Sequence, residues 1–261
     1  MKHSLSGSLI AALALVLTCV SNGGTDHLDK PGWKLTFNDE FDGSALDLRK
    51  WSPSDPWGHE RNRELQAYVT NAFELKDGIL RIRADKGEAF YSGKQRAFTS
   101  GMMTTHGKFS QEYGLFEIRC RVPKGKGMWP AFWLLPEPLR WPPEIDVMEI
   151  LGHEPAKIYL THHFQAEDNG QRRHKSDGGS WAGPDFSADF HEFAVEWSSD
   201  RIVWLVDGVE RFRSEKSIPH GPMYMLVNLA VGGDWPGAPD EKTQFPTALE
   251  VDYVRVYEKA P

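Results

Sequence analysis

Three acidic residues, Glu144, Asp146 and Glu149, lie within the short stretch PPEIDVMEILG at 142–152. The other residues of the stretch are mostly apolar, a composition that predicts a buried β-strand. Carboxyls held close together repel one another, which raises the pKa of at least one of them and suits it to act as a general acid. The spacing therefore indicates acid–base chemistry by paired carboxyls, with an amphipathic strand that has an acidic solvent side as the alternative.

Strand geometry sets a condition on how the three acids can share one face. Side chains alternate along a strand, so Glu144 and Asp146 face one side while Val147 faces the core. Strict alternation would send Glu149 into the core, where an unpaired carboxylate costs several kcal/mol or a large pKa shift. A β-bulge at Val147 and Met148 would add one residue to the strand and return Glu149 to the acidic face. We therefore expect a bulge at this place.

Aromatic residues lie close to this stretch in the sequence. Trp129 and Trp133 are four residues apart in GMWPAFWLLPEP (127–138), so an extended chain presents both on one face. Trp235 lies in the Gly- and Pro-rich segment GGDWPG (232–237), where core packing is less expected. The chain holds 10 Trp and 7 Tyr, and sugars dock on such rings, although large aromatics also fill β-cores. These residues favour a sugar-binding cleft beside the acids.

The elements that must position these residues are predicted to be β-strands. Alternating or continuous β-branched and aromatic patterns occur at 78–85, 114–122, 191–197, 201–208 and 248–258, and no comparable stretch has helical periodicity. Turn signals lie between them, among them KDG (76–78) and VDGV (206–209), where Asp-Gly predicts a tight hairpin. Many short antiparallel strands indicate a β-sandwich or jelly roll.

The first 24 residues differ from the rest of the chain. Lys2 and His3 precede the apolar run LIAALALVL (9–17), a pattern typical of a secretory signal and too short for a transmembrane helix. We expect residues 1–24 to direct export to the periplasm, the cell surface or the medium, and 25–261 to form one domain. Cys19 stands where a lipoprotein would carry its lipid, but Leu17 and Thr18 fit that motif poorly, so a lipid anchor is the weaker alternative.

Composition and net charge limit the kinds of molecule that the protein is expected to bind. Of the 261 residues, 40% are hydrophobic, and the net charge is −7. That charge argues against nucleic acid and against anionic membranes, both of which select basic surfaces. The chain has 2 Cys, and without Cys19 the remaining Cys120 has no disulfide partner. We expect a monomer stabilised by its core, with a neutral polymer as partner.

The segment EIDVME (144–149) matches the E-x-D-x-x-E signature of glycoside hydrolase family 16, in the form that carries one extra residue. The resemblance covers nearly all of 25–261. ELQAY (64–68) and GGDWPG (232–237) resemble the laminarinase branch, which cleaves β-1,3-glucans. Three departures leave the substrate open: WPPEIDV (141–147) replaces a longer Gly-containing loop, THHF (161–164) differs from the usual segment, and Ala67 stands where an aromatic is frequent. Other matching segments are FNDEFDG (37–43), YGLFEIRCRVPKGKGMWPAFWLLP (113–136) and VDYVRVYE (251–258).

The resemblance implies a concave β-jelly roll of two antiparallel sheets with a substrate cleft. It implies a secreted, endo-acting, retaining hydrolase of β-1,3-glucan in which Glu144 is the nucleophile, Glu149 the general acid/base and Asp146 the residue between them. Hydrolysis of β-1,3/1,4-glucan or a β-galactan, and transglycosylation, remain alternatives within this fold. A non-catalytic glycan-binding jelly roll is a further alternative, against which the three mutually repelling acids argue.

Family positions also suggest residues outside the signature. His163 is expected to hydrogen-bond a sugar or the acid/base, while alternation turns the adjacent His162 away, so the pair does not predict a metal site. Hydrolysis is expected to need no cofactor, but the resemblance implies a structural Ca²⁺ far from the cleft. The expected substrate-binding residues are Glu64, Trp129, Trp133, His163, Asn228 and Trp235, and the expected calcium ligands are Glu40, Gly78 and Asp252.

Overall fold

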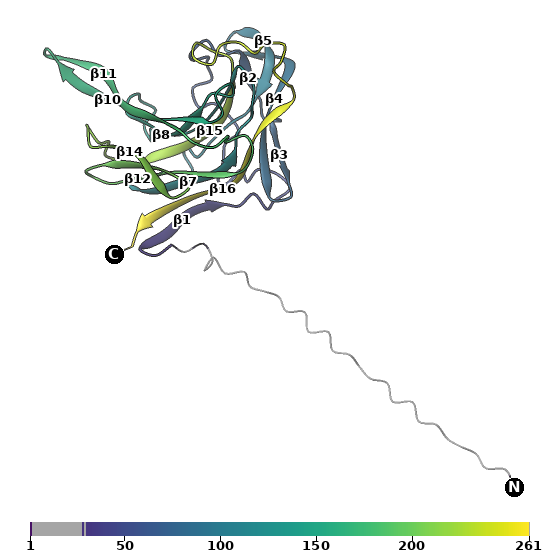
Figure 1. Ribbon diagram of the computed structural model, residues 1–261, viewed down its shortest axis with the longest axis horizontal. Helices are drawn as coiled ribbons and strands as arrows, with labels where there is room; N and C mark the ends of the chain where they lie inside the picture. Colours follow the sequence, from purple (N-terminus) through teal and green to yellow (C-terminus); the bar gives the residue numbers. More distant parts are fainter. Residues whose placement is uncertain (2–27, 29, 261) are drawn as a thin grey trace.

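Sixteen β-strands in two sheets, and no α-helix, make up the part of the chain that the computed structural model describes, namely Met1, Leu28 and residues 30–260. Apart from Met1, the export signal expected over 1–24, with Cys19, lies outside the described residues. No described segment is a helix long and apolar enough to cross a membrane. The two sheets lie face to face, as Figure 1 shows, and confirm the predicted all-β sandwich.

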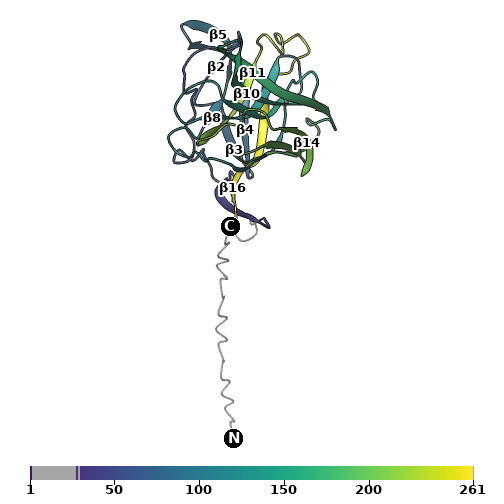
Figure 2. The same ribbon diagram turned by 90° about the vertical axis from the view of Figure 1, so that its left-hand side faces the viewer.

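The larger sheet has ten strands in the order β14-β13-β12-β7-β16-β4-β5-β2, with β1 beside β16 and β3 beside β4. Every pair in it is antiparallel except β2 and β5, which are parallel. These two strands lie at the end of the domain far from the C-terminus (Figures 1 and 2). The strands are β1 (Trp33–Asp39), β2 (Gln66–Tyr68), β3 (Phe73–Lys76), β4 (Ile79–Tyr91), β5 (Lys94–Ser100), β7 (Gly114–Arg121), β12 (His191–Trp197), β13 (Ile202–Val206), β14 (Val209–Ser214) and β16 (Thr247–Lys259).

The smaller sheet has six antiparallel strands in the order β11-β10-β9-β8-β15-β6. Its outer pair, β10 and β11, is a long hairpin that projects beyond the other strands in Figure 1. The acidic stretch forms β9, near the middle of this sheet. The strands are β6 (Met102–Thr104), β8 (Met128–Pro136), β9 (Glu144–Ile150), β10 (Lys157–Asp168), β11 (Gln171–Ala182) and β15 (Met223–Val231).

All five strands predicted from alternation are present, as β4, β7, β12, β13 and β16. The hairpin predicted from Asp-Gly is also confirmed: Asp207 and Gly208 alone connect β13 to β14, with φ angles of 50° and 72°. Both residues adopt the left-handed conformation that a two-residue type I′ turn requires, which glycine and Asp tolerate better than most residues. Local sequence therefore determines this connection.

The core fills the space between the two sheets. Phe116 and Ile118 of β7 and Phe132 and Leu134 of β8 are fully buried in one cluster. Burial of each such side chain contributes roughly 1.5–3 kcal/mol, so the core is the main source of stability. Cys120 lies in the same cluster and has no disulfide partner among the described residues.

The β-bulge predicted in β9 is confirmed. On the neighbouring strand β10, Leu160 alone lies opposite Val147 and Met148. Both β9 residues are fully buried in the core. The extra residue restores the alternation, so that Glu149 lies on the same face of the sheet as Asp146. The bulge thus lets two successive apolar residues enter the core while all three acids face away from it.

A tryptophan of the opposite sheet holds this bulge from inside the core. The indole N–H of Trp204, on β13, donates a 2.8 Å hydrogen bond to the backbone carbonyl of Asp146. Trp204 is fully buried, and a hydrogen bond in such surroundings is not weakened by competition with water. The contact fixes the position of β9 relative to the ten-stranded sheet at the residue where the bulge begins.

Deletion of Met148 tests the bulge. In the shortened strand, plain alternation keeps all three acids on the cleft face, so the variant is expected to fold and to retain measurable hydrolysis at a reduced rate. Loss of a buried Met side chain lowers the free energy of unfolding by roughly 2–5 kcal/mol. Met148→Ala is the control, because it removes the same packing but keeps the bulge. A deletion variant with native near-UV circular dichroism that is as inactive as Glu149→Ala would contradict this explanation.

His162 points away from the acidic face, as predicted, and is fully buried beside Phe164. Neither ring nitrogen has a hydrogen-bond partner among the described residues. Burial, and next the nearby His163, lower the pKa of His162 to about 4. The folded protein therefore favours the neutral ring, whereas an unfolded chain protonates it near pH 6.5.

This difference predicts an acid-sensitive contribution to stability. Because the folded-state pKa is depressed, the contribution is complete above about pH 6.5 and is lost as the pH falls to about 4, by about 3 kcal/mol in total. The measurement is the free energy of unfolding in denaturant between pH 7 and 4. His162→Leu should lose about 3 kcal/mol less than the wild type over this range. The exposed His153→Leu serves as control and should follow the wild type.

Candidate active site

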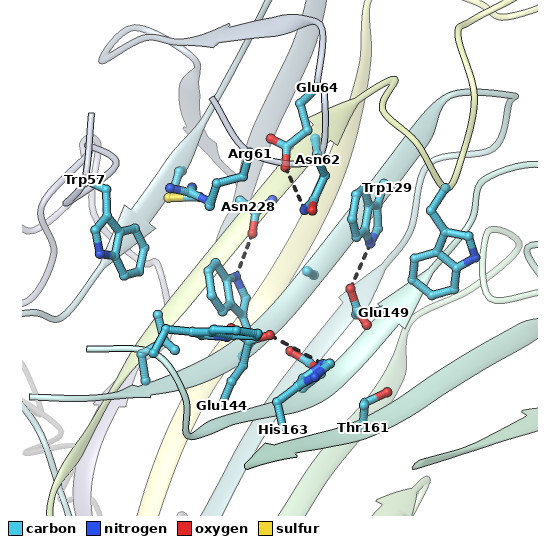
Figure 3. A pocket seen from close by; sticks show the side chains of 18 of the residues that line it. Trp57, Arg61, Asn62, Glu64, Trp129, Glu144, Glu149, Thr161, His163 and Asn228 are labelled. Atoms are coloured by element: carbon cyan, nitrogen blue, oxygen red, sulfur yellow. Dashed lines mark hydrogen bonds and ion pairs between the residues drawn. The ribbon is translucent and has the colours of Figure 1, made fainter. Parts of the chain in front are cut away.

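A cleft of about 760 Å³ lies on the outer face of the six-stranded sheet. Strands β8, β9, β10 and β15 supply most of its lining, and the segment 57–68 supplies one wall. Figure 3 shows side chains from these strands converging on the cleft. The structure brings together every residue that was predicted to act on substrate: Glu64, Trp129, Trp133, Glu144, Asp146, Glu149, His163, Asn228 and Trp235.

The three acids of β9 line the cleft and are largely withdrawn from water. Burial is the main cause that raises the pKa of each of them. The pKa of Glu149 rises to about 7, with the charge of Glu144 as the second cause. Asp146 also adds to the rise at Glu144, since like charges close together cannot all ionise easily. At least one acid therefore keeps a proton near neutral pH.

Glu144 and Glu149 each accept a hydrogen bond from an indole N–H. Glu144 accepts a 3.0 Å bond from the indole N–H of Trp141, and Nε2 of His163 lies 3.7 Å from its other oxygen. Both neighbours lower the pKa of Glu144 and so oppose the effect of burial. Glu149 accepts a 3.0 Å bond from the indole N–H of Trp129 (Figure 3). Trp129 and His163 likewise oppose the effect of burial at Glu149. Each glutamate therefore has two neighbours that favour its charged form, while the charge of Glu144 favours the proton on Glu149.

Asp146 lies between these two acids and has the least hydrogen bonding. Its Oδ2 atom is buried without a hydrogen-bond partner, and Nε2 of His163 is 3.2 Å away. Ligand atoms of Glu144, Asp146 and His163 lie within 4.8 Å of one another, a group that could hold a small cation. These are also the atoms that would face a bound sugar, so a cation there would compete with the sugar.

Tryptophans line both sides of the acids. Trp57 and Trp133 stack with ring centroids 6.1 Å apart, and Trp129 meets Trp235 edge to face at 5.4 Å. In Figure 3, Trp57 and Trp129 lie on opposite sides of the cleft. With Trp141, five of the ten Trp line the cleft. The aromatic content of the sequence therefore reflects the cleft as much as the core.

A chain of hydrogen bonds fixes Trp133 from behind. Its indole N–H donates to Asn228 (2.8 Å), whose amide donates to the hydroxyl of Tyr68 (3.1 Å), which in turn donates to Glu64 (3.3 Å). Glu64 also accepts a 2.7 Å bond from Gln66. Asn228 and Glu64, which were predicted to bind sugar, are both buried. Their hydrogen bonds in this chain orient the cleft wall.

Several cleft residues were missed from the sequence, among them Trp57, Arg61 and Trp141. Arg61 pairs with Asp55 at 3.1 Å and lies over the ring of Trp57 at 4.7 Å. All three come from segments outside the strands, where no periodic pattern predicts the direction of a side chain. The one available signal was the position of Trp141, three residues before Glu144.

The residues expected to bind calcium make other contacts. The carboxylate of Glu40 accepts hydrogen bonds of 3.0 and 2.7 Å from Arg255, and Asp252 pairs with Arg119. Gly78 forms the turn between β3 and β4, with a φ of 73°. Two guanidinium groups beside the acids would repel a dication, so these side chains, as they lie, do not fit Ca²⁺. The calcium site stays a prediction from the resemblance.

Two carboxyls whose mutual repulsion favours one charged and one protonated group can cleave a glycosidic bond when both face an aromatic cleft. The fold and the site thus point to the glycoside hydrolases. The family model described as "Glycosyl hydrolases family 16" matches residues 62–255. The chain belongs to this family, as its signature at 144–149 predicted.

Known proteins agree with this assignment. The chain is 39% identical to the β-glucanase of Rhodothermus marinus, over 95% of this chain and 93% of that protein. It is 36% identical to the endo-1,3-1,4-β-glycanase EglC of Rhizobium meliloti (strain 1021), over 88% of this chain and 53% of that longer protein. The laminarinase catalytic domain of Thermotoga maritima MSB8 matches with a TM-score of 0.78 at 36% identity, over 88% of this chain and 99% of that one. These likenesses confirm the predicted jelly roll.

The hydrogen bond from Trp129 to Glu149 predicts the pH dependence of the reaction. The resemblance implies that Glu149 is the general acid, which must be protonated, so kcat/KM is expected to fall as the pH rises through the pKa of Glu149, at about 7. Trp129→Phe removes a donor that favours the charged form, so this alkaline limb should move up by roughly one pH unit. Trp133→Phe is the control, because its indole bonds to Asn228 instead. Equal shifts in both variants, or a downward shift in Trp129→Phe, would contradict the assignment.

Proposed function

We propose that this protein is an endo-acting glycoside hydrolase that cleaves β-1,3-glucan of the laminarin type with retention of the anomeric configuration. The observation that carries the proposal is a pair of buried acids, Glu144 and Glu149, on one face of a bulged strand. Burial and the charge of Glu144 raise the pKa of Glu149 to about 7, while Trp141 and His163 oppose the effect of burial at Glu144. A retaining glycosidase requires this combination of one ionised and one protonated carboxyl.

The proposed reaction has two steps. In the first, the carboxylate of Glu144 attacks the anomeric carbon, and Glu149 gives its proton to the departing glycosidic oxygen, which leaves a glycosyl ester on Glu144. In the second, Glu149 takes a proton from water while the water oxygen attacks the same carbon and releases Glu144. Burial raises the pKa of Asp146, so this residue adds little negative charge beside the nucleophile. No metal takes part.

The lining of the cleft supports internal cleavage of a polymer. Aromatic rings lie on both sides of the acids, with Trp57 and Trp133 on one side and Trp129 and Trp235 on the other. Such rings can hold sugar units before and after the bond that is cut. The relatives named a β-glucanase and a laminarinase support a β-glucan as substrate.

Mixed-linkage β-1,3/1,4-glucan is the second candidate substrate. It is favoured by the 36% identity to an endo-1,3-1,4-β-glycanase. A β-galactan is a weaker alternative, and a sugar in place of water as acceptor would make the enzyme a transglycosylase.

We also propose export directed by residues 1–24, with a lipid anchor at Cys19 as the weaker alternative.

Activity on a panel of polysaccharides tests the substrate and the acids together. The protein should release a mixture of oligosaccharides from laminarin. The measurement is the size and amount of the products from laminarin, compared with those from lichenan, agarose and β-galactan as alternative substrates. Glu144→Ala should lower turnover on the order of 10⁵-fold while leaving the fold and oligosaccharide binding intact. Glu88→Ala, which removes an exposed acid outside the cleft, is the control and should match the wild type. Substantial turnover in Glu144→Ala would assign the chemistry elsewhere.

The configuration of the first product tests the two-step route. Early products followed by NMR should carry the β configuration at the new reducing end, because two displacements at one carbon restore the original geometry. An α product that appears first would mean a single displacement by water, and the roles given to Glu144 and Glu149 would then be wrong.

A further inference from the structure

His174 lies outside the cleft lining but contacts two residues that reach into it. It is on β11, the edge strand of the six-stranded sheet. Its Nε2 atom is 2.9 Å from Nδ1 of His163, and its ring centroid is 4.6 Å from that of Trp141. His163 comes from β10 and Trp141 from the segment that leads into β9. His174 thus connects three separate segments beside the acids.

His163 and Trp141, the two residues that His174 contacts, also lie against the acids of β9. The indole N–H of Trp141 donates to Oε2 of Glu144 at 3.0 Å. Nε2 of His163 lies 3.2 Å from Oδ2 of Asp146 and 3.7 Å from Oε1 of Glu144. His174 is therefore linked to Glu144 through both Trp141 and His163, and to Asp146 through His163.

The hydrogen bond between His163 and His174 also determines which ring nitrogen of His163 carries the hydrogen. A neutral imidazole carries one N–H, so the group that faces Nδ1 determines whether Nε2 donates or accepts. His174 is exposed, but its partial desolvation, and next the nearby His163, lower its pKa, which keeps its own ring neutral near pH 7. When His174 donates to Nδ1, the N–H of His163 is at Nε2 and faces the carboxylate oxygens of Asp146 and Glu144.

Trp141 depends on His174 for packing. Its side chain belongs to an exposed residue, 51% accessible to solvent, in a segment with no strand pairing. The described ring contacts of Trp141 are with His163 and His174, and the His174 ring is the closer of the two. A ring held at few points loses its orientation easily, because fixing a free side chain has an entropic cost.

We propose that His174 is a positioning residue for the reaction: it orients Trp141 and His163 so that they hold the nucleophile Glu144 and its neighbour Asp146 in the reactive geometry. It does so without touching the substrate. This inference rests on the proposed function, because it assigns His174 a role in the attack by Glu144.

Three substitutions separate the two contacts of His174. His174→Ala removes both, His174→Phe keeps a ring against Trp141, and His174→Gln keeps a donor for His163. We expect kcat on the polysaccharide that the wild type cleaves to fall roughly 10- to 100-fold in His174→Ala, with KM within about twofold. The Phe and Gln variants should each recover part of the loss. Arg172→Ala, two residues away on the same face of the hairpin, is the control and should match the wild type.

A second substrate distinguishes positioning of the nucleophile from a general loss of structure. An aryl β-glucoside oligomer with a dinitrophenolate leaving group needs no proton from Glu149, so its cleavage reports mainly the attack by Glu144. The loss in His174→Ala should be of similar size on this substrate. Near-UV circular dichroism should be native in all variants; if the Ala variant unfolds, the Phe and Gln variants carry the same comparison.

The outcomes that would overturn the inference are specific. They are a kcat for His174→Ala within twofold of the wild type, a loss equal to that of Arg172→Ala, a change in KM alone, or a loss that disappears with the aryl substrate. A wild type that cleaves neither kind of substrate would instead overturn the proposed function. The two failures are therefore distinguishable.

Discussion

The arrangement of this site depends on one irregularity in one strand. The extra residue in β9 places Val147 and Met148 in the core together, and the three acids consequently share the cleft face. The hydrogen bond from Trp204 to the carbonyl of Asp146 ties this irregularity to the opposite sheet. The position of the acids is thus set by a buried contact behind them, so residues deep in the core and residues in the cleft form one structural unit.

The two indole donors that face the acids are neutral, and this has an electrostatic consequence. Trp129 and Trp141 each offer one indole N–H, which favours a carboxylate less strongly than an arginine or lysine would. A cation at the place of Trp129 would pull the pKa of Glu149 far below neutral and remove its proton. The indole compensates for part of the burial and leaves the pKa at about 7. Arg61, which also lines the cleft, is paired with Asp55 instead.

Much of the fold and the centre of the site could be predicted from the sequence, for physical reasons that differ between them. The strands follow from side-chain alternation, and the bulge follows from a conflict, because regular alternation would have buried Glu149. Trp57 and Trp141 were missed, since side-chain direction in an irregular segment depends on contacts made elsewhere in the chain. The contact between His163 and His174 requires the register of the β10–β11 hairpin, which no pattern within either strand specifies.

The hairpin that carries His174 leaves β11 as a long edge of the sheet, and such edges can pair with strands of other molecules. Near its tip the edge presents Arg172, Arg173 and Lys175, all exposed. A second copy approaching this edge would bring like charges together, and desolvating them is unfavourable. The same strand that reaches toward the active centre therefore carries its own protection against aggregation.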